Sequence, residues 1–162
     1  IILPIIFFLE SCSNLQFVYK KSPELERLYQ STLYDVSGDN SDEIRSIINQ
    51  KLDKSNKSGK YVLNINSKKT TSKIVTQNDK TASGLEIRFT ITYKLKDNIK
   101  KCQIYEKSLI TQSSYNMRSS SYNFGSDIAV LEISKKIIDS NIGNFFDDLI
   151  LNYNTEECLN EN

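Results

Sequence analysis

The chain contains no histidine. Because a Ser-His pair, a Cys-His pair and a His-ligated metal all need imidazole, these three kinds of catalytic site are excluded within this chain. Glycine is scarce as well, and none of the five glycines belongs to a Gly-rich loop that could cradle phosphates. An enzyme would then depend on paired carboxylates, on a Lys or Cys nucleophile, or on a metal with oxygen ligands.

Adjacent carboxylates occur twice, at Asp147-Asp148 and at Glu156-Glu157. Neighbouring residues of a helix point in different directions and do not converge on one site. We therefore expect that the protein is not an enzyme, and that it has no catalytic residue, no metal site and no bound cofactor.

Neither sign of charge dominates the chain. Lys and Arg total 21, Asp and Glu total 20, and the net charge is +1, which argues against a dedicated nucleic-acid-binding protein. No segment reaches the roughly 20 apolar residues that a membrane-spanning helix needs. With 162 residues the chain has the length of one ordinary domain.

The longest apolar run, Ile1–Leu9, ends just before a cysteine. Its length suits the apolar region of a secretory signal. Because neither Met nor a basic segment precedes it, we expect either that the sequence is truncated or that the true start lies upstream of Ile1. Leu9, Ser11 and Cys12 follow the bacterial lipoprotein pattern, whereas Glu10 departs from it. We predict a covalent diacylglycerol and an N-acyl chain, such as palmitate, on Cys12, where each buried methylene contributes about 0.8 kcal/mol to anchoring. The alternative is an ordinary buried segment with a free thiol.

The residue after Cys12 is Ser13. Inner-membrane lipoproteins often carry Asp at this place, so serine favours the outer membrane. Two further cysteines, Cys102 and Cys158, could pair in the oxidising cell envelope. Two unpaired thiols, with Cys102 on a strand, are an equal alternative, because the sequence does not give their separation.

Hydrophobic periodicity outlines the secondary structure. Residues Leu85–Leu95 alternate apolar and polar side chains without exception, which predicts a half-buried antiparallel strand. Isoleucines at helical spacing after Ser41 predict a helix that ends near Ser55. The remaining predictions are strands at Arg27–Val36, at Tyr61–Lys68 with a continuation at Ser72–Thr76 and at Lys101–Tyr115, and a closing helix from Asp127 to Tyr153.

The order strand, helix, three strands, helix predicts a two-layer α+β sandwich. Its sheet is four-stranded and mostly antiparallel, and both helices cover one face. We expect a signal peptide at residues 1–11, a lipid-anchored tether at 12–26, the α+β domain at 27–153 and a polar tail at 154–162. The uncovered face of the sheet is predicted to be polar, through Glu86, Arg88, Thr90, Thr92 and Lys94.

Three stretches resemble the LPS-assembly lipoprotein LptE family, particularly its alphaproteobacterial forms. The first is Cys12 with its short tether and the Leu25–Val36 segment. The second is the alternating strand LEIRFTITYKLKD. The third and most specific is Ser114–Leu151, which is similar to the family's SYN-containing strand end, Ser-rich loop and closing helix. The resemblance covers nearly the whole chain after Cys12.

The resemblance implies an outer-membrane lipoprotein of the Gram-negative cell envelope, on the periplasmic face. Members of the family sit as a plug inside the β-barrel partner LptD, help it assemble, and with it deliver lipopolysaccharide to the outer leaflet. Lipopolysaccharide carries phosphates, so direct contact would use cations. The candidates are Lys68, Lys69, Lys73 and Arg118, with ordinary solvated cations as the alternative reading. A generic lipid- or peptide-binding envelope lipoprotein is the alternative function.

Overall fold

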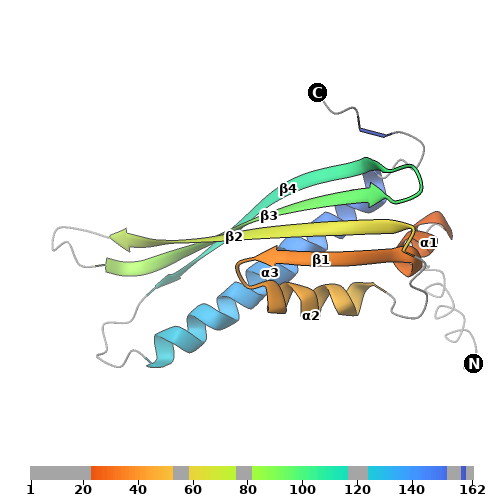
Figure 1. The fold of residues 1–162 in the computed structure, drawn as a ribbon. Coiled ribbons are helices and arrows are strands. Elements are labelled where there is room, and N and C mark those ends of the chain that lie inside the picture. Colours follow the sequence, from red (N-terminus) through yellow and green to blue (C-terminus); the bar gives the residue numbers. More distant parts are fainter. Residues whose placement is uncertain (1–22, 53–58, 76–81, 117–123, 153–157, 160–162) are drawn as a thin grey trace, which may run out of the picture.

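A computed structural model describes residues 23–52, 59–75, 82–116, 124–152 and 158–159 of the chain (Figure 1). These residues form three helices and four strands. They are α1 Pro23–Ser31, β1 Thr32–Gly38, α2 Ser41–Lys51, β2 Tyr61–Val75, β3 Ala82–Asp97, β4 Cys102–Asn116 and α3 Phe124–Asn152.

The strands form one sheet in the order β1-β2-β3-β4. The pair β1–β2 is parallel, because α2 lies between them in the chain, and the other two pairs are antiparallel. The long strands β2 and β3 pair along their whole length, whereas β1 ends where Gly38 meets Ser67. The predicted mostly antiparallel, four-stranded α+β architecture is therefore confirmed.

Helices α2 and α3 lie on the same face of this sheet (Figure 1). The predicted inward stripe of α2 is buried, with Ile44 and Ile48 fully enclosed. The apolar side chains of β3 point toward the helices, so the core of the molecule lies between the sheet and the helices. Its fully buried large side chains are Tyr93, Phe89, Phe145, Ile44, Ile48, Leu63, Ile65, Ile87, Ile91, Leu95, Ile138 and Ile142.

The start of α2 depends on a tight turn after β1. Gly38 has φ +92°, and a Cβ placed there would lie 2.0 Å from the carbonyl oxygen of Ser67. Only glycine tolerates both this backbone conformation and this close approach. Asn40 then adopts the left-handed conformation at φ 55° and its carbonyl accepts the first helical bond, from the Ile44 amide.

The strand predicted at Arg27–Val36 is wrong in its first half, where the structure has the end of α1. Pro23 occupies the first helical position, where its missing N–H costs no hydrogen bond. Leu28 and Tyr29 are buried, and the Tyr29 ring packs edge-on against Phe146 at 5.5 Å between centroids. Packing of this short helix against α3 therefore overrides the strand propensity of the segment.

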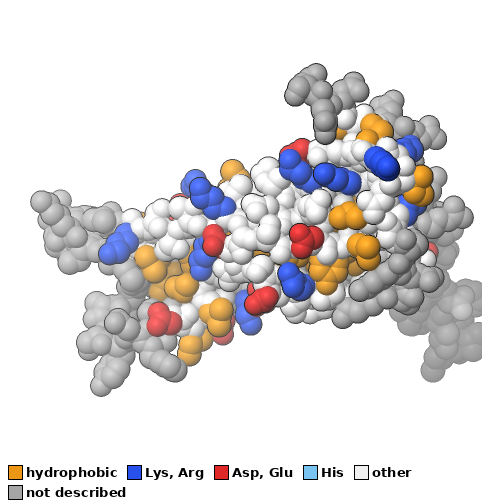
Figure 2. Space-filling view, in the orientation of Figure 1, with side chains coloured by type: hydrophobic (Ala, Val, Ile, Leu, Met, Phe, Trp, Pro, Cys, Tyr) orange, Lys and Arg blue, Asp and Glu red, His pale blue; other side chains and the backbone are white. Residues whose placement is uncertain are grey.

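The closing helix is also longer than predicted and is buried over only part of its length. In its C-terminal half Ile138, Ile142 and Phe145 are buried, whereas Ile150, which the same helical spacing places on the apolar stripe, is 41% exposed. The sequence spacing places Ile128 and Leu131 on this stripe too, but they are 47% and 51% exposed. Hydrophobic side chains gather accordingly over the start of α3 in the space-filling view (Figure 2). At the start of α3 the sheet thus covers one side of the helix and leaves the side with Ile128 and Leu131 exposed.

Candidate functional site

The uncovered face of the sheet is polar, as predicted, and its side chains bond to one another within β3 and between β3 and β4. Arg88 donates to Gln112 on β4 at 2.9 Å and forms an ion pair with Glu86 at 3.3 Å. Lys94 pairs with Glu106 at 3.1 Å. Hydrogen bonds from Gln103 and Lys94 hold the pKa of the Glu106 carboxyl below its ordinary value. These exposed pairs hold the side chains of this face in place, but they contribute little to the free energy of folding.

The three candidate lysines lie on β2 beyond the end of β1. Lys68 is exposed on the polar face, opposite Thr90. Lys69 and Lys73 alternate to the face that carries the helices, because their partners are Phe89 and Leu85. The three cations therefore share one edge of the sheet but divide between its two faces.

Lys69 is engaged by the fold itself. Its ammonium donates to the Ser134 hydroxyl on α3 at 3.2 Å and lies 5.7 Å from the centroid of the Phe89 ring. Its backbone amide donates to the Asp39 carboxylate at 2.7 Å. Sequence reasoning missed these contacts, because Ser134 is 65 residues away and reads as an ordinary helix residue. Lys73 is exposed, so Lys68 and Lys73 are the more accessible pair.

Two of the predicted site residues, Cys12 and Arg118, lie outside the described residues. Within the described part of the chain no group of three His, Cys, Asp or Glu side chains is arranged to hold a metal ion. None of the described helices has the length and apolarity needed to cross a membrane.

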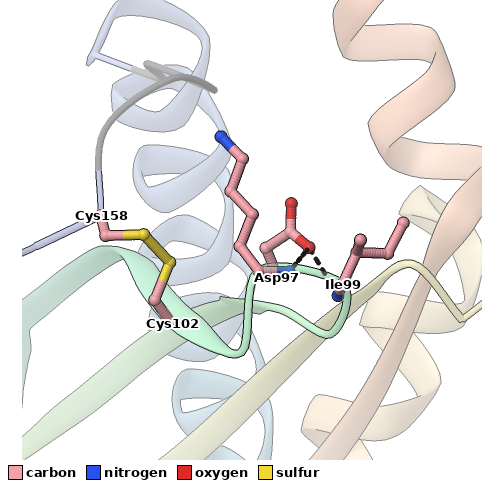
Figure 3. The surroundings of a disulfide bond; sticks show 5 residues. Asp97, Ile99, Cys102 and Cys158 are labelled. Atoms are coloured by element: carbon pink, nitrogen blue, oxygen red, sulfur yellow. Dashed lines mark hydrogen bonds between the residues drawn. A yellow bond between two sulfur atoms is a disulfide. The ribbon is translucent and has the colours of Figure 1, made fainter.

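The structure joins Cys102 and Cys158, an alternative that the sequence left open (Figure 3). Cys102 is the first residue of β4 and Cys158 follows the end of α3, with their Cα atoms 5.7 Å apart. The amide of Leu159 also donates to the carbonyl of Gln103 at 2.8 Å. The tail is thereby fastened to the start of β4.

The C-terminal half of α3 is held to β4 by a polar cluster around Asp148. Its carboxylate accepts hydrogen bonds from Tyr105 and, at 3.3 Å, from Lys107, and from Asn152 at 3.0 Å on its own helix. The Tyr105 hydroxyl foremost, with Lys107 and Asn152, holds the pKa of the Asp148 carboxyl below its usual value. Burial, then the bond to Asp148, raises the pKa of Tyr105. This cluster joins α3 to β4.

Further along the same boundary, α3 is held by Asn141. It accepts a hydrogen bond from the buried Tyr93 hydroxyl at 2.8 Å and donates to Thr111 Oγ1 at 2.8 Å. Beyond this point a hollow of about 230 Å³ lies between the two elements. Its lining residues are Thr111, Gln112, Ser113, Ile133, Lys136, Ile137 and Ser140. The sequence pattern gave no sign of this hollow, since its residues come from segments about 25 positions apart.

No protein-family model and no curated protein matches the chain. Solved structures do match its fold. A minor lipoprotein from Acinetobacter baumannii has a TM-score of 0.59 at 16% identity, covering 76% of this chain and 92% of that one. A candidate lipoprotein from Caulobacter crescentus CB15 also has a TM-score of 0.59, at 12% identity, covering 78% of this chain and 92% of that one.

Rare lipoprotein B from Shewanella oneidensis also matches, at 10% identity and a TM-score of 0.47, over 75% of this chain and 91% of its own. That score is too low to support an inference. At the identities of the other two, the likeness establishes a shared fold, and both of those structures are of proteins described as lipoproteins.

Proposed function

We propose that the chain is an outer-membrane lipoprotein, anchored through acyl chains on Cys12 at the periplasmic face. In this proposal it is the plug and assembly subunit of the lipopolysaccharide translocon, in complex with the β-barrel LptD. It acts by binding and by shape, without covalent catalysis. The observation that carries the proposal is the combination of the Leu9–Cys12 pattern with a fold shared with two proteins described as lipoproteins.

The chemistry of the domain supports an envelope location. Disulfides persist in oxidising compartments such as the periplasm and are rare in the cytosol, and Cys102 is disulfide-bonded to Cys158. The polar sheet face supports the plug role. A wide barrel has a polar, hydrated interior, and a face built from cross-strand pairs such as Lys94–Glu106 can meet water or polar groups without leaving a buried charge unpaired.

Co-purification tests the partnership. The full chain carrying an affinity tag is recovered from detergent-solubilised outer membranes, and its partners are identified by mass spectrometry. We expect one large β-barrel protein in near-equal amount. A generic lipid- or peptide-binding lipoprotein would be recovered without that barrel, so its absence would reject the translocon role while leaving the anchor intact.

The anchor is tested separately. Metabolic labelling with a palmitate analogue is expected to tag the wild-type chain and to leave the Cys12→Ala variant untagged. Purified away from the barrel, the variant is also expected to lose binding to lipid vesicles, because the domain then lacks the acyl chains that would anchor it. Equal labelling of the two chains would contradict lipidation at Cys12.

Direct lipopolysaccharide contact is proposed for Lys68, Lys69, Lys73 and Arg118. Replacing the accessible Lys68 and Lys73 together by alanine is expected to weaken lipopolysaccharide capture about tenfold, at roughly 0.7 kcal/mol for each exposed cation. The matched control replaces Lys94 and Lys96, exposed lysines of the same sheet near the end of β3. If both double variants lose capture equally, general charge rather than this edge is responsible.

A further inference from the structure

The outer edge of β4 differs from the other free edges of the sheet. On the opposite side, the Arg45 guanidinium donates to the Val36 carbonyl on β1, and the free part of β2 carries three lysines. Charged side chains of this kind discourage the addition of another strand. The segment Ser108–Tyr115 of β4 contains no charged residue, no proline and no glycine. No strand pairs with its outer edge among the described residues.

The protection that β4 does have is confined to its start. The disulfide at Cys102 and the Leu159–Gln103 bond cover the first residues, and Glu106 and Lys107 follow. From Ser108 onward no described strand covers the edge, and the Leu109 carbonyl accepts a hydrogen bond from the Asn141 side chain at 3.1 Å. Ile110 points away from the helices and is 65% exposed, an unusual position for a large aliphatic side chain at a strand edge.

The hollow between β4 and α3 lies beside this segment. Thr111 and Ser113 line it from the strand, and Ile133 and Ile137 line it from the helix. Lys136 is the single charged side chain among its lining residues, and it is exposed. A strand added to the edge would turn alternate side chains toward this hollow, which offers an aliphatic surface and one cation.

We propose that the Ser108–Tyr115 edge is a docking site for an extended strand of another protein. On the side that faces α3, that strand carries an aliphatic residue and a carboxylate that pairs with Lys136. Backbone hydrogen bonds along the edge supply the affinity, and the hollow supplies the specificity. A second copy of this chain is a poorer occupant, because antiparallel self-pairing centred on Gln112 would bring two Lys136 side chains together. The inference does not depend on the proposed function.

The test uses the full chain in detergent and two short synthetic peptides. In each peptide threonine alternates with valine, and the central valine is replaced by glutamate in one and by lysine in the other. The glutamate peptide is expected to shift the backbone amide signals of Ser108–Tyr115 in NMR titrations. It should bind up to about fivefold more tightly than the lysine peptide, because one exposed ion pair can supply a difference of that size. The Lys136→Glu variant should reverse that preference.

Two variants place a charge on the edge. Ile110→Lys and Ser114→Lys remove no buried contact, since both side chains are exposed, and Ser114 lies opposite Glu86. Each is expected to weaken peptide binding at least about tenfold, whereas Thr70→Lys on the free edge of β2 should leave it unchanged. Failure of both peptides to bind would overturn the proposal, as would binding that either β4 variant leaves intact. A concentration-dependent dimer that Ile110→Lys abolishes would overturn it in favour of self-association.

Discussion

Reduction of the Cys102–Cys158 disulfide is expected to destabilise the domain by about 4 kcal/mol. The bond joins residues that are 56 positions apart in the chain. In the chain-entropy account, a closed loop of that length removes about 14 cal/mol/K from the unfolded ensemble, which is about 4 kcal/mol at 25 °C. The backbone hydrogen bond from Leu159 to Gln103 contributes only about 1 kcal/mol beside it.

The full chain in detergent is unfolded with urea, with and without a reductant, and unfolding is monitored by circular dichroism. The urea midpoint should fall on reduction, and in a thermal scan of the same samples the expected loss corresponds to a fall of roughly 10 °C in Tm. The Cys102→Ser/Cys158→Ser variant should unfold like the reduced wild-type chain and should be indifferent to the reductant. This control separates the crosslink from any effect of reductant on the rest of the molecule.

The prediction also concerns where the destabilisation lies. Phe145 and the other core residues come from the helices and the sheet, and neither Cys158 nor Leu159 is among them. Native-state hydrogen exchange should therefore rise most at Gln103 and its neighbours, which open locally, while the amides at the centre of β3 lose only the protection that corresponds to about 4 kcal/mol of global stability. An unchanged unfolding midpoint on reduction would refute the reasoning, and so would exchange at the centre of β3 as fast as at Gln103.

Three further substitutions test the fold. Gly38→Ala forces a side chain into a left-handed backbone beside Ser67 and should lower the free energy of unfolding by at least about 2 kcal/mol in urea titrations. Phe145→Ala removes a fully buried ring stacked 4.0 Å from Tyr93 and should lower it by about 3–5 kcal/mol, measured in the same way. Because the folded-state pKa of Asp148 is lowered, the stability it contributes is complete above the ordinary carboxyl pKa of about 3.9 and is lost as pH falls through the lowered value. Asp148→Asn should flatten that acid-side loss in unfolding measured as a function of pH; an unaltered pH profile would contradict the role of the carboxylate.

The parts of the fold that could be predicted from the sequence are those where one face of an element is buried along its whole length. β3 is central in the sheet and covered by helices on one side only, so burial and exposure alternate from Ile87 to Leu95. The same holds for α2, whose isoleucines all face the core. In both cases the period of hydrophobicity reports the local geometry directly.

The parts that could not be predicted depend on contacts between distant segments. Leu28 and Tyr29 suit a strand as well as a helix, and only their packing beside Phe146 decides between them. The pairing of Cys102 with Cys158 depends on where α3 ends relative to β4, which no local pattern encodes. The engagement of Lys69 by Ser134 likewise follows from how α3 crosses the sheet.

The treatment of the sheet edges links the fold to both proposals. An open sheet leaves backbone groups unpaired at its two sides, and proteins usually cover or charge such edges. Here Arg45 and the lysines of β2 charge one side, and the disulfide-bonded tail covers the start of the other. The remaining stretch, Ser108–Tyr115, is left uncharged beside a hollow that contains Lys136. A domain that functions by fitting a partner needs such a place where addition is favoured, and protection elsewhere would confine pairing to that stretch and set the orientation of the bound strand.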